Sequence, residues 1–203
     1  MNPVRKFWES CRPQYAHLRL GENHIFYKLY DENILNHFRV SLKDKVIIDY
    51  GCGGAILAHR LMAKGIRKYI GIDISERSRI QAKRNTAELG IETEFHPENA
   101  DLSKFNADVL FCFAVIQHFE SERYLSKFLQ RLNRSGIKHI CLHIRHASQT
   151  RFNNAYAKAG DVGRACHTNP EYIARHMPAY VVTKATEPQP QIDSQGIILR
   201  LKK

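Results

Sequence analysis

The chain has 203 residues, of which 43% are hydrophobic, and a formal net charge of +11 at pH 7. This length suits one domain with a buried core of ordinary size. Because no apolar run is long enough to cross a bilayer and the N-terminus lacks an apolar leader, we expect a soluble, cytoplasmic protein with no membrane partner. The five cysteines are scattered and form no C-x-x-C pair, which disfavours a disulfide framework and a zinc site.

The positive charge is greatest toward the C-terminal end. Residues 137–203 contain 10 Lys and Arg against 4 Asp and Glu. Such an excess is typical of a solvated basic face, and equally of a surface that holds a polyanion. The charge alone leaves both interpretations open.

The first 45 residues contain aromatic and apolar residues at helical spacing, most clearly in ENHIFYKLYDENILNHF (22–38). This spacing predicts helices rather than strands. We therefore expect residues 1–45 to form a helical cap on a main domain that spans residues 46–203.

Strand and helix patterns alternate between residues 46 and 146. Ser75 is a suitable N-cap for a basic helix that runs to about Gly90, and Ser121 is suitable for a later one that stops before Gly136. Alternation at this spacing indicates parallel β-α-β units in a doubly wound sheet, which binds its ligands beyond the carboxyl ends of the strands. The predicted strands are 46–49, 68–75, 93–100, 107–116 and 138–146.

The pattern changes after the fifth strand. Residues 146–169 are polar and aperiodic, and Asn169-Pro170 then begins a helix that ends near His176. Two strand patterns, 179–186 and 196–203, flank a turn-rich segment and predict an antiparallel hairpin. The expected fold class is α/β, with a doubly wound, mostly parallel seven-stranded sheet, an antiparallel C-terminal strand and the N-terminal helical cap.

A glycine turn follows the first strand in VIIDYGCGG (46–54). The dinucleotide fingerprint requires G-x-G-x-x-G, and counted from Gly51 the third glycine position holds Ile56. Asp49 stands two residues before Gly51, where a carboxylate would repel a pyrophosphate and attract a cation. The turn therefore favours a cofactor other than a dinucleotide.

This turn resembles the first motif of the class I S-adenosylmethionine-dependent methyltransferases, in which it passes under the methionine part of the cofactor and the acid helps to place its ammonium group. Asp73, which lies 22 residues after Gly51, resembles the acid that binds both ribose hydroxyls in this family. The resemblance covers roughly residues 40–145 and implies S-adenosyl-L-methionine as the cofactor. The residues that it implies for binding are Asp49, Gly51, Gly53, Asp73, Ile74, Asn99, Ala100 and Phe113. The commoner residue at the adenine contact is Asp, so Asn99 departs from the pattern.

The cofactor already makes methyl transfer favourable, so the protein mainly aligns the reactants and in some cases supplies a base. His118, just after the fourth strand, and His146, at the end of the fifth, are candidate catalytic bases because imidazole titrates in the useful range. A packing role at the entry to the next helix is the alternative for His118. His139, His143 and His146 lie on or beside one strand, where three ligands do not converge, so we expect no metal site.

The sequence predicts a methyltransferase that acts on oxygen or nitrogen of a small metabolite. The basic residues of the insert 146–178, which we expect to cover the acceptor, favour an anionic one. The segment after the fourth strand, FAVIQHF, lacks the Asn/Asp-Pro-Pro-aromatic motif of enzymes that methylate amino groups of nucleic acids. Two alternatives stay open: an RNA- or protein-modifying methyltransferase, and a non-catalytic S-adenosylmethionine-binding regulator. The oligomeric state is not defined by the sequence.

Overall fold

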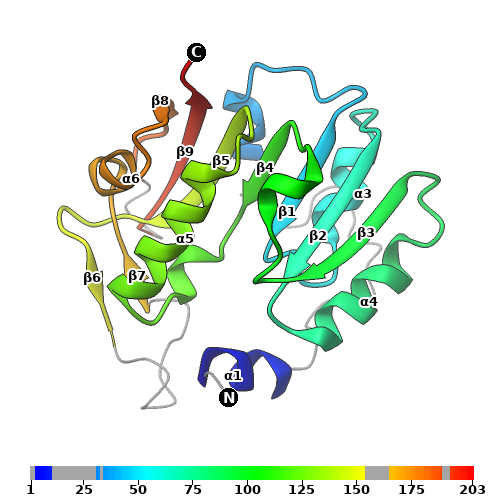
Figure 1. The fold of residues 1–203 in the computed structure, drawn as a ribbon, viewed down its shortest axis with the longest axis horizontal. Coiled ribbons are helices and arrows are strands. Elements are labelled where there is room, and N and C mark those ends of the chain that lie inside the picture. The colour runs from blue at the N-terminus through cyan, green and yellow to red at the C-terminus, as the bar shows by residue number, and fades with distance from the viewer. Residues whose placement is uncertain (1–2, 11–30, 33, 154–164, 189–192) are drawn as a thin grey trace.

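One mixed seven-stranded sheet organises the chain in the computed structural model, which describes residues 3–10, 31–32, 34–153, 165–188 and 193–203 (Figure 1). The strand order is β3-β2-β1-β4-β5-β9-β8, in which β1 to β5 run parallel and β9 runs antiparallel to both β5 and β8. The predicted fold class is confirmed. The strands are β1 Val46–Tyr50, β2 Lys68–Asp73, β3 Glu92–Pro97, β4 Val109–Cys112, β5 His139–Arg145, β8 Tyr180–Ala185 and β9 Ser194–Leu201.

Helices connect the parallel strands and cover both faces of the sheet. Ser75, Ser121 and Asn169 each accept a hydrogen bond from the backbone N–H three residues later, so the predicted N-caps begin α4, α5 and α6. The α-helices are α1 Pro3–Ser10, α3 Ile56–Met62, α4 Glu76–Thr86, α5 Glu122–Arg134 and α6 Pro170–His176, and the 3-10 helices are η1 Leu35–His37, η2 Leu102–Phe105 and η3 Ile116–His118.

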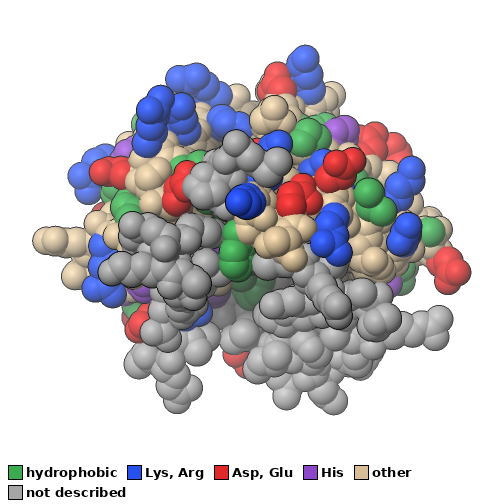
Figure 2. Space-filling model, turned by 90° about the horizontal axis from the view of Figure 1, so that it is seen from below, with side chains coloured by type: hydrophobic (Ala, Val, Ile, Leu, Met, Phe, Trp, Pro, Cys, Tyr) green, Lys and Arg blue, Asp and Glu red, His purple; other side chains and the backbone are tan. Residues whose placement is uncertain are grey.

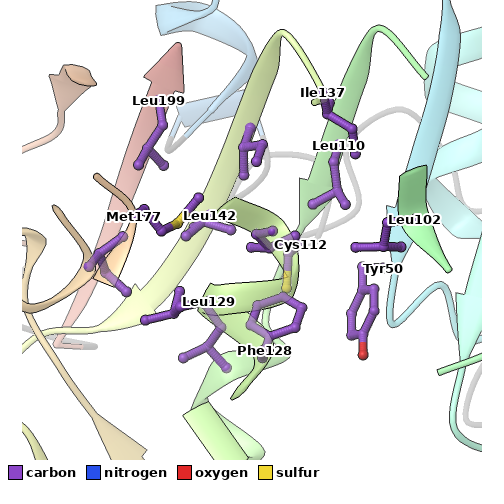
Figure 3. Packing of buried hydrophobic residues seen from close by; sticks show 14 of the residues in the cluster. Tyr50, Leu102, Leu110, Cys112, Phe128, Leu129, Ile137, Leu142, Met177 and Leu199 are labelled. Atoms are coloured by element: carbon purple, nitrogen blue, oxygen red, sulfur yellow. The ribbon is translucent and has the colours of Figure 1, made fainter. Parts of the chain in front are cut away.

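The core consists of two apolar layers, one on each face of the sheet. On one face, Leu110 of β4 and Leu142 of β5 pack with Phe128 and Leu129 of α5. Met177, the C-cap residue of α6, belongs to the same cluster (Figure 3). The other face packs against α3 and α4 through a cluster that includes Ile47, Tyr69, Phe111, Cys141, Leu57, Leu61 and Ala82. Because both faces of the sheet are buried, the sequences of the parallel strands are nearly continuous runs of apolar residues.

Three local predictions differ from the structure. The fourth strand, expected at 107–116, is β4 Val109–Cys112, because Ile116–His118 already forms η3. Helix α4 ends at Thr86 rather than near Gly90, since residues 87–90 form a turn that ends with Gly90 at φ +67. Within the segment expected to be aperiodic, Arg151–Phe152 (β6) pairs with Cys166–His167 (β7) as a second, two-stranded sheet. Strands of two residues have no measurable periodicity, so the pattern could not reveal them.

The predicted N-terminal cap is described only in part. Residues 11–30 and 33 lie outside the described residues, so the helical segment expected at 22–38 is seen only at its end, where η1 forms. In the parts of the chain that are described, no helix combines the length and apolarity needed to span a bilayer. The division into residues 1–45 and 46–203 stays a prediction.

Candidate functional site

The glycine turn folds back from β1 onto the end of β2. The backbone N–H groups of Gly51 and Cys52 both donate to the carbonyl of Ile72, at 2.6 and 3.0 Å. Gly51 has φ +81, and a Cβ placed on it would lie 2.1 Å from a methyl carbon of Val115. Only glycine fits this position, because both the backbone conformation and the space beside β4 exclude a side chain.

The second glycine of the turn has space beside it among the described residues. Gly53 has φ +51, and a Cβ added there would meet no atom of the described part of the chain within 4 Å. Its backbone N–H donates to Asp73 Oδ2 at 2.9 Å, and the N–H of Ser75 donates to Asp73 Oδ1 at 2.8 Å. A carboxylate has about four lone-pair sites, so each oxygen of Asp73 can still accept a further hydrogen bond. The turn and the acid therefore form one unit with room above Gly53 for a hydroxylated ligand.

Two carboxyl groups, those of Asp49 and Asp73, lie at the ends of neighbouring strands and are both hard to ionise. Asp49 is buried, and its Oδ2 accepts a hydrogen bond of 2.6 Å from the hydroxyl of Tyr69. Burial, reinforced by the charge of Asp73, raises the pKa of Asp49 to about 7. Burial also raises the pKa of Asp73, although the N–H groups of Ser75 and Gly53 act in the opposite direction.

The remaining residues predicted to bind the cofactor follow β2, β3 and β4. Ile74, Ala100 and Phe113 are partly buried, and Asn99 is exposed. The carbonyl of Ala100 accepts a hydrogen bond of 2.8 Å from Arg131 Nη2 of α5, which fixes the turn after β3. The structure thus brings the predicted residues to the carboxyl ends of β1 to β4. Their contacts with a cofactor stay predictions.

Helix α1 lies across these strand ends (Figure 1). Arg5 forms an ion pair with Glu98, after β3, at 2.6 Å. Glu9 accepts hydrogen bonds from the N–H of Glu76 at 2.8 Å and from the hydroxyl of Ser75 at 3.1 Å, after β2. The sequence pattern predicted a helical cap but gave no sign of this placement, because the partners lie more than 60 residues apart.

The two predicted catalytic histidines lie at neighbouring strand ends. His118, in η3, is partly buried, and its ring packs edge-on against Trp8 of α1 with centroids 4.8 Å apart. His146 forms a backbone bridge to Thr168, and its N–H donates to the carbonyl of Asp193 at 2.6 Å. The bridge to Thr168 ties His146 to the end of β7, so it is less free than a loop residue. A role for either as a base stays a prediction.

The described residues hold no group of three or more His, Cys, Asp and Glu side chains suited to a metal ion. A cavity of about 340 Å³ lies elsewhere, between η1 and α3. Its lining includes Asp31 and Arg60, which form an ion pair, together with Lys64 and residues between 35 and 42, which precede β1. This is the amino end of the sheet, so the cavity is separate from the carboxyl-end site.

Residues 47–136 match the family model described as a methyltransferase domain. The chain is 27% identical over 108 residues to a ubiquinone biosynthesis O-methyltransferase of Nitrosomonas europaea, a stretch that covers 51% of this chain and 46% of the relative. It is 40% identical over 81 residues to a ribosomal protein L11 methyltransferase of Acinetobacter baylyi, covering 36% of this chain and 26% of the relative. The chain therefore spans less than half of either curated relative.

Solved structures share the fold at low sequence identity. The PH0226 protein of Pyrococcus horikoshii matches with a TM-score of 0.61 and 16% identity over 95% of this chain and 100% of that one. The magnesium protoporphyrin IX methyltransferase of Synechocystis PCC 6803, solved with bound SAH, matches with a TM-score of 0.58 and 17% identity over 79% of this chain and 76% of that one. The spare lone pairs of Asp73 and the space above Gly53 among the described residues would fit a ligand with two neighbouring hydroxyl groups.

Proposed function

We propose that the chain, whose residues 47–136 match a methyltransferase domain, is a class I S-adenosylmethionine-dependent methyltransferase that transfers a methyl group to oxygen or nitrogen of a small, anionic molecule. When bound, the cofactor supplies an activated methyl group on a sulfonium. The protein then has to bind the donor, orient the acceptor and exclude water.

Asp73, Gly53 and Asp49 hold the cofactor in this proposal. The free lone pairs of Asp73 accept hydrogen bonds from the two ribose hydroxyls, and the open space above Gly53 admits the methionine part. Asp49, beneath the turn, attracts the ammonium group once it is ionised. Ile74 and Asn99 flank the adenine, and Phe113 borders the pocket at the end of β4.

The placement of α1 supports a small acceptor over a macromolecule. Its contacts with Glu98, Ser75 and His118 cover the ends of β2, β3 and β4 from one side, which would restrict the approach of a large acceptor to these strand ends. Among the described side chains seen from this side, Lys and Arg are interspersed with Asp and Glu (Figure 2). The ubiquinone biosynthesis relatives support the same choice, whereas the ribosomal protein L11 relatives favour a protein acceptor.

Two measurements test the proposal. Calorimetry with S-adenosylhomocysteine should show binding that Asp73→Asn abolishes and that Glu92→Gln, an exposed carboxylate at the amino end of β3, leaves unchanged. Release of S-adenosylhomocysteine should then be assayed with a library of small anionic hydroxyl and amino compounds, with RNA and with a protein extract. Turnover on RNA or protein alone, or tight RNA binding that falls steeply with salt, would exclude the small acceptor. Cofactor binding without methylation of any tested compound, RNA or protein would indicate a non-catalytic S-adenosylmethionine-binding regulator.

A further inference from the structure

Several polar side chains at the end of β5 and the start of β9 have buried atoms with no hydrogen-bond partner among the described residues, and His143 and Ser194 are two of them. His143 is 6% exposed, and both of its ring nitrogens lack such a partner. The hydroxyl of Ser194, a residue that is 1% exposed, has none either. Burying a polar group without a partner lowers stability, so such groups are rare in folded proteins unless they serve a ligand.

The position of His143 relates it to the cofactor site. Asp49, Phe111 and Cys141 are in register across β1, β4 and β5. Phe113 and His143 each come two residues later and therefore emerge on the same side of the sheet. Their rings are in contact, with centroids 4.4 Å apart. His143 thus lies one strand beyond Phe113, the residue that borders the proposed cofactor pocket.

The surroundings keep the His143 ring neutral. Burial, together with the positive charge of Arg145 on the same strand face, lowers the pKa of His143 to about 3. A neutral imidazole offers one N–H donor and one lone pair. Ser194, which pairs with Arg145 across the two strands, also offers a donor and an acceptor, and Gly196, which has no side chain, lies opposite His143.

The ring nitrogens of His143 and the hydroxyl of Ser194 match a ligand hydroxyl better than a carboxylate or an ammonium group. A carboxylate can only accept hydrogen bonds, so it would leave the lone pair of His143 unused, and an ammonium group can only donate. An alkyl amine is an ammonium ion at neutral pH, and the charge of Arg145 would repel it. A hydroxyl is neutral, donates and accepts.

We propose that His143 and Ser194 form the acceptor subsite, and that the acceptor is an alcohol or phenol whose reacting hydroxyl hydrogen-bonds to the ring of His143. Methylation of this oxygen would replace the hydroxyl proton, which would pass to solvent, and S-adenosylhomocysteine would be the other product. This inference rests on the proposed function and narrows the methylated atom from oxygen or nitrogen to a hydroxyl oxygen. The Phe113 ring gives the subsite an apolar wall.

Nuclear magnetic resonance of the full chain tests the contact without turnover. The protein, labelled with ¹⁵N-histidine and loaded with S-adenosylhomocysteine, is titrated with 4-hydroxybenzoate and separately with 4-methylbenzoate, which replaces the hydroxyl by a methyl group. The His143 ring signals, assigned by their loss in His143→Asn, should shift with the hydroxyl compound alone. Equal shifts of the His143 signals with both compounds, or no shift with either, overturn the proposal. The unpaired ring nitrogens would then be attributed to contacts with buried water.

Variants separate binding from a structural role. His143→Phe keeps a ring against Phe113 and removes both unsatisfied nitrogens, so we expect an unchanged or higher melting temperature, unchanged affinity for S-adenosylhomocysteine, and about tenfold weaker binding of 4-hydroxybenzoate. His139→Phe, on the same face at the other end of β5, is the control and should bind both compounds as the parent does. If His143→Phe does not fold, His143→Asn is used and should also bind 4-hydroxybenzoate more weakly.

The failure of this inference is distinct from failure of the proposed function. Absence of S-adenosylhomocysteine binding in the parent protein refutes the proposed function itself. Cofactor binding with an unchanged preference for 4-hydroxybenzoate in the His143 variants refutes only the acceptor subsite. A loss of stability with that preference intact assigns His143 to the fold.

Discussion

The buried carboxyl group of Asp49 should make the stability of the fold depend on pH and, in the proposed function, the cofactor affinity as well. Its pKa is raised from 3.8 to about 7 in the folded protein. Between these values the folded chain holds a proton that the unfolded chain has released, so the unfolded state binds fewer protons and stability falls as pH rises. A shift of about 3 units corresponds to about 4 kcal/mol, lost progressively between pH 4 and pH 7.

Asp49→Asn removes this contribution and keeps an oxygen that can accept the hydrogen bond from Tyr69. Urea denaturation from pH 4.5 to 8.5 gives the free energy of unfolding of the parent and the variant. We expect the parent to lose stability relative to the variant as pH rises, by an amount approaching about 4 kcal/mol at pH 7. Glu88→Gln, an exposed carboxylate, is the control and should follow the parent.

The same proton controls binding in the proposed function. If ionised Asp49 attracts the ammonium group of S-adenosylmethionine, the apparent affinity should rise up to about tenfold per pH unit below pH 7 and level off above it. Calorimetry in two buffers of different ionisation enthalpy should show proton release at pH 6. The reasoning is refuted if Asp49 titrates below pH 5, or if Asp49→Asn retains the pH dependence of the parent.

Three further substitutions probe the turn and the cap. Gly51→Ala should destabilise the fold by about 2–4 kcal/mol in urea denaturation, because the methyl group would strain a positive φ and clash with Val115; a loss below 1 kcal/mol contradicts this. Gly53→Ala should cost only about 1–2 kcal/mol of stability but weaken S-adenosylhomocysteine binding at least about tenfold, since the methyl group enters the open space; unchanged affinity would mean that the cofactor lies elsewhere. Glu9→Gln should speed cofactor release in stopped-flow measurements by weakening the contact of α1 with the N–H of Glu76, and an unchanged rate would show that α1 does not cover the cofactor.

The sheet could be predicted because its signals are local. Apolar runs of four to eight residues ending at glycines or N-caps mark the parallel strands, and Ser75, Ser121 and Asn169 begin helices as predicted. The end of α4 was misplaced because Gly90 is a good stop signal although the helix ends four residues earlier. The β6–β7 pair was missed because two-residue strands leave no pattern.

The grouping of the predicted cofactor-binding residues at one end of the sheet could be predicted for a similar reason. Asp49, the glycines and Asp73 lie within 25 residues, since two consecutive strand ends contribute them. What the sequence could not give is the environment of these groups. The hydrogen bond from Tyr69 to Asp49 depends on β1 and β2 being paired in one register, and the pKa of Asp49 follows from that burial.

The acceptor side is assembled from residues distant in sequence, and for that reason it emerges only from the structure. His143 and Ser194 belong to strands separated by about 50 residues and meet because β9 returns antiparallel to β5. Filling this place with apolar side chains would stabilise the fold, and retaining unsatisfied polar atoms lowers its stability. Ligand-binding sites commonly contain polar groups that lower the stability of the free protein, because the bound ligand supplies their hydrogen-bond partners. The unpaired atoms of His143 and Ser194 therefore argue for a hydroxyl-bearing acceptor more strongly than the net charge of the chain argues for an anionic one.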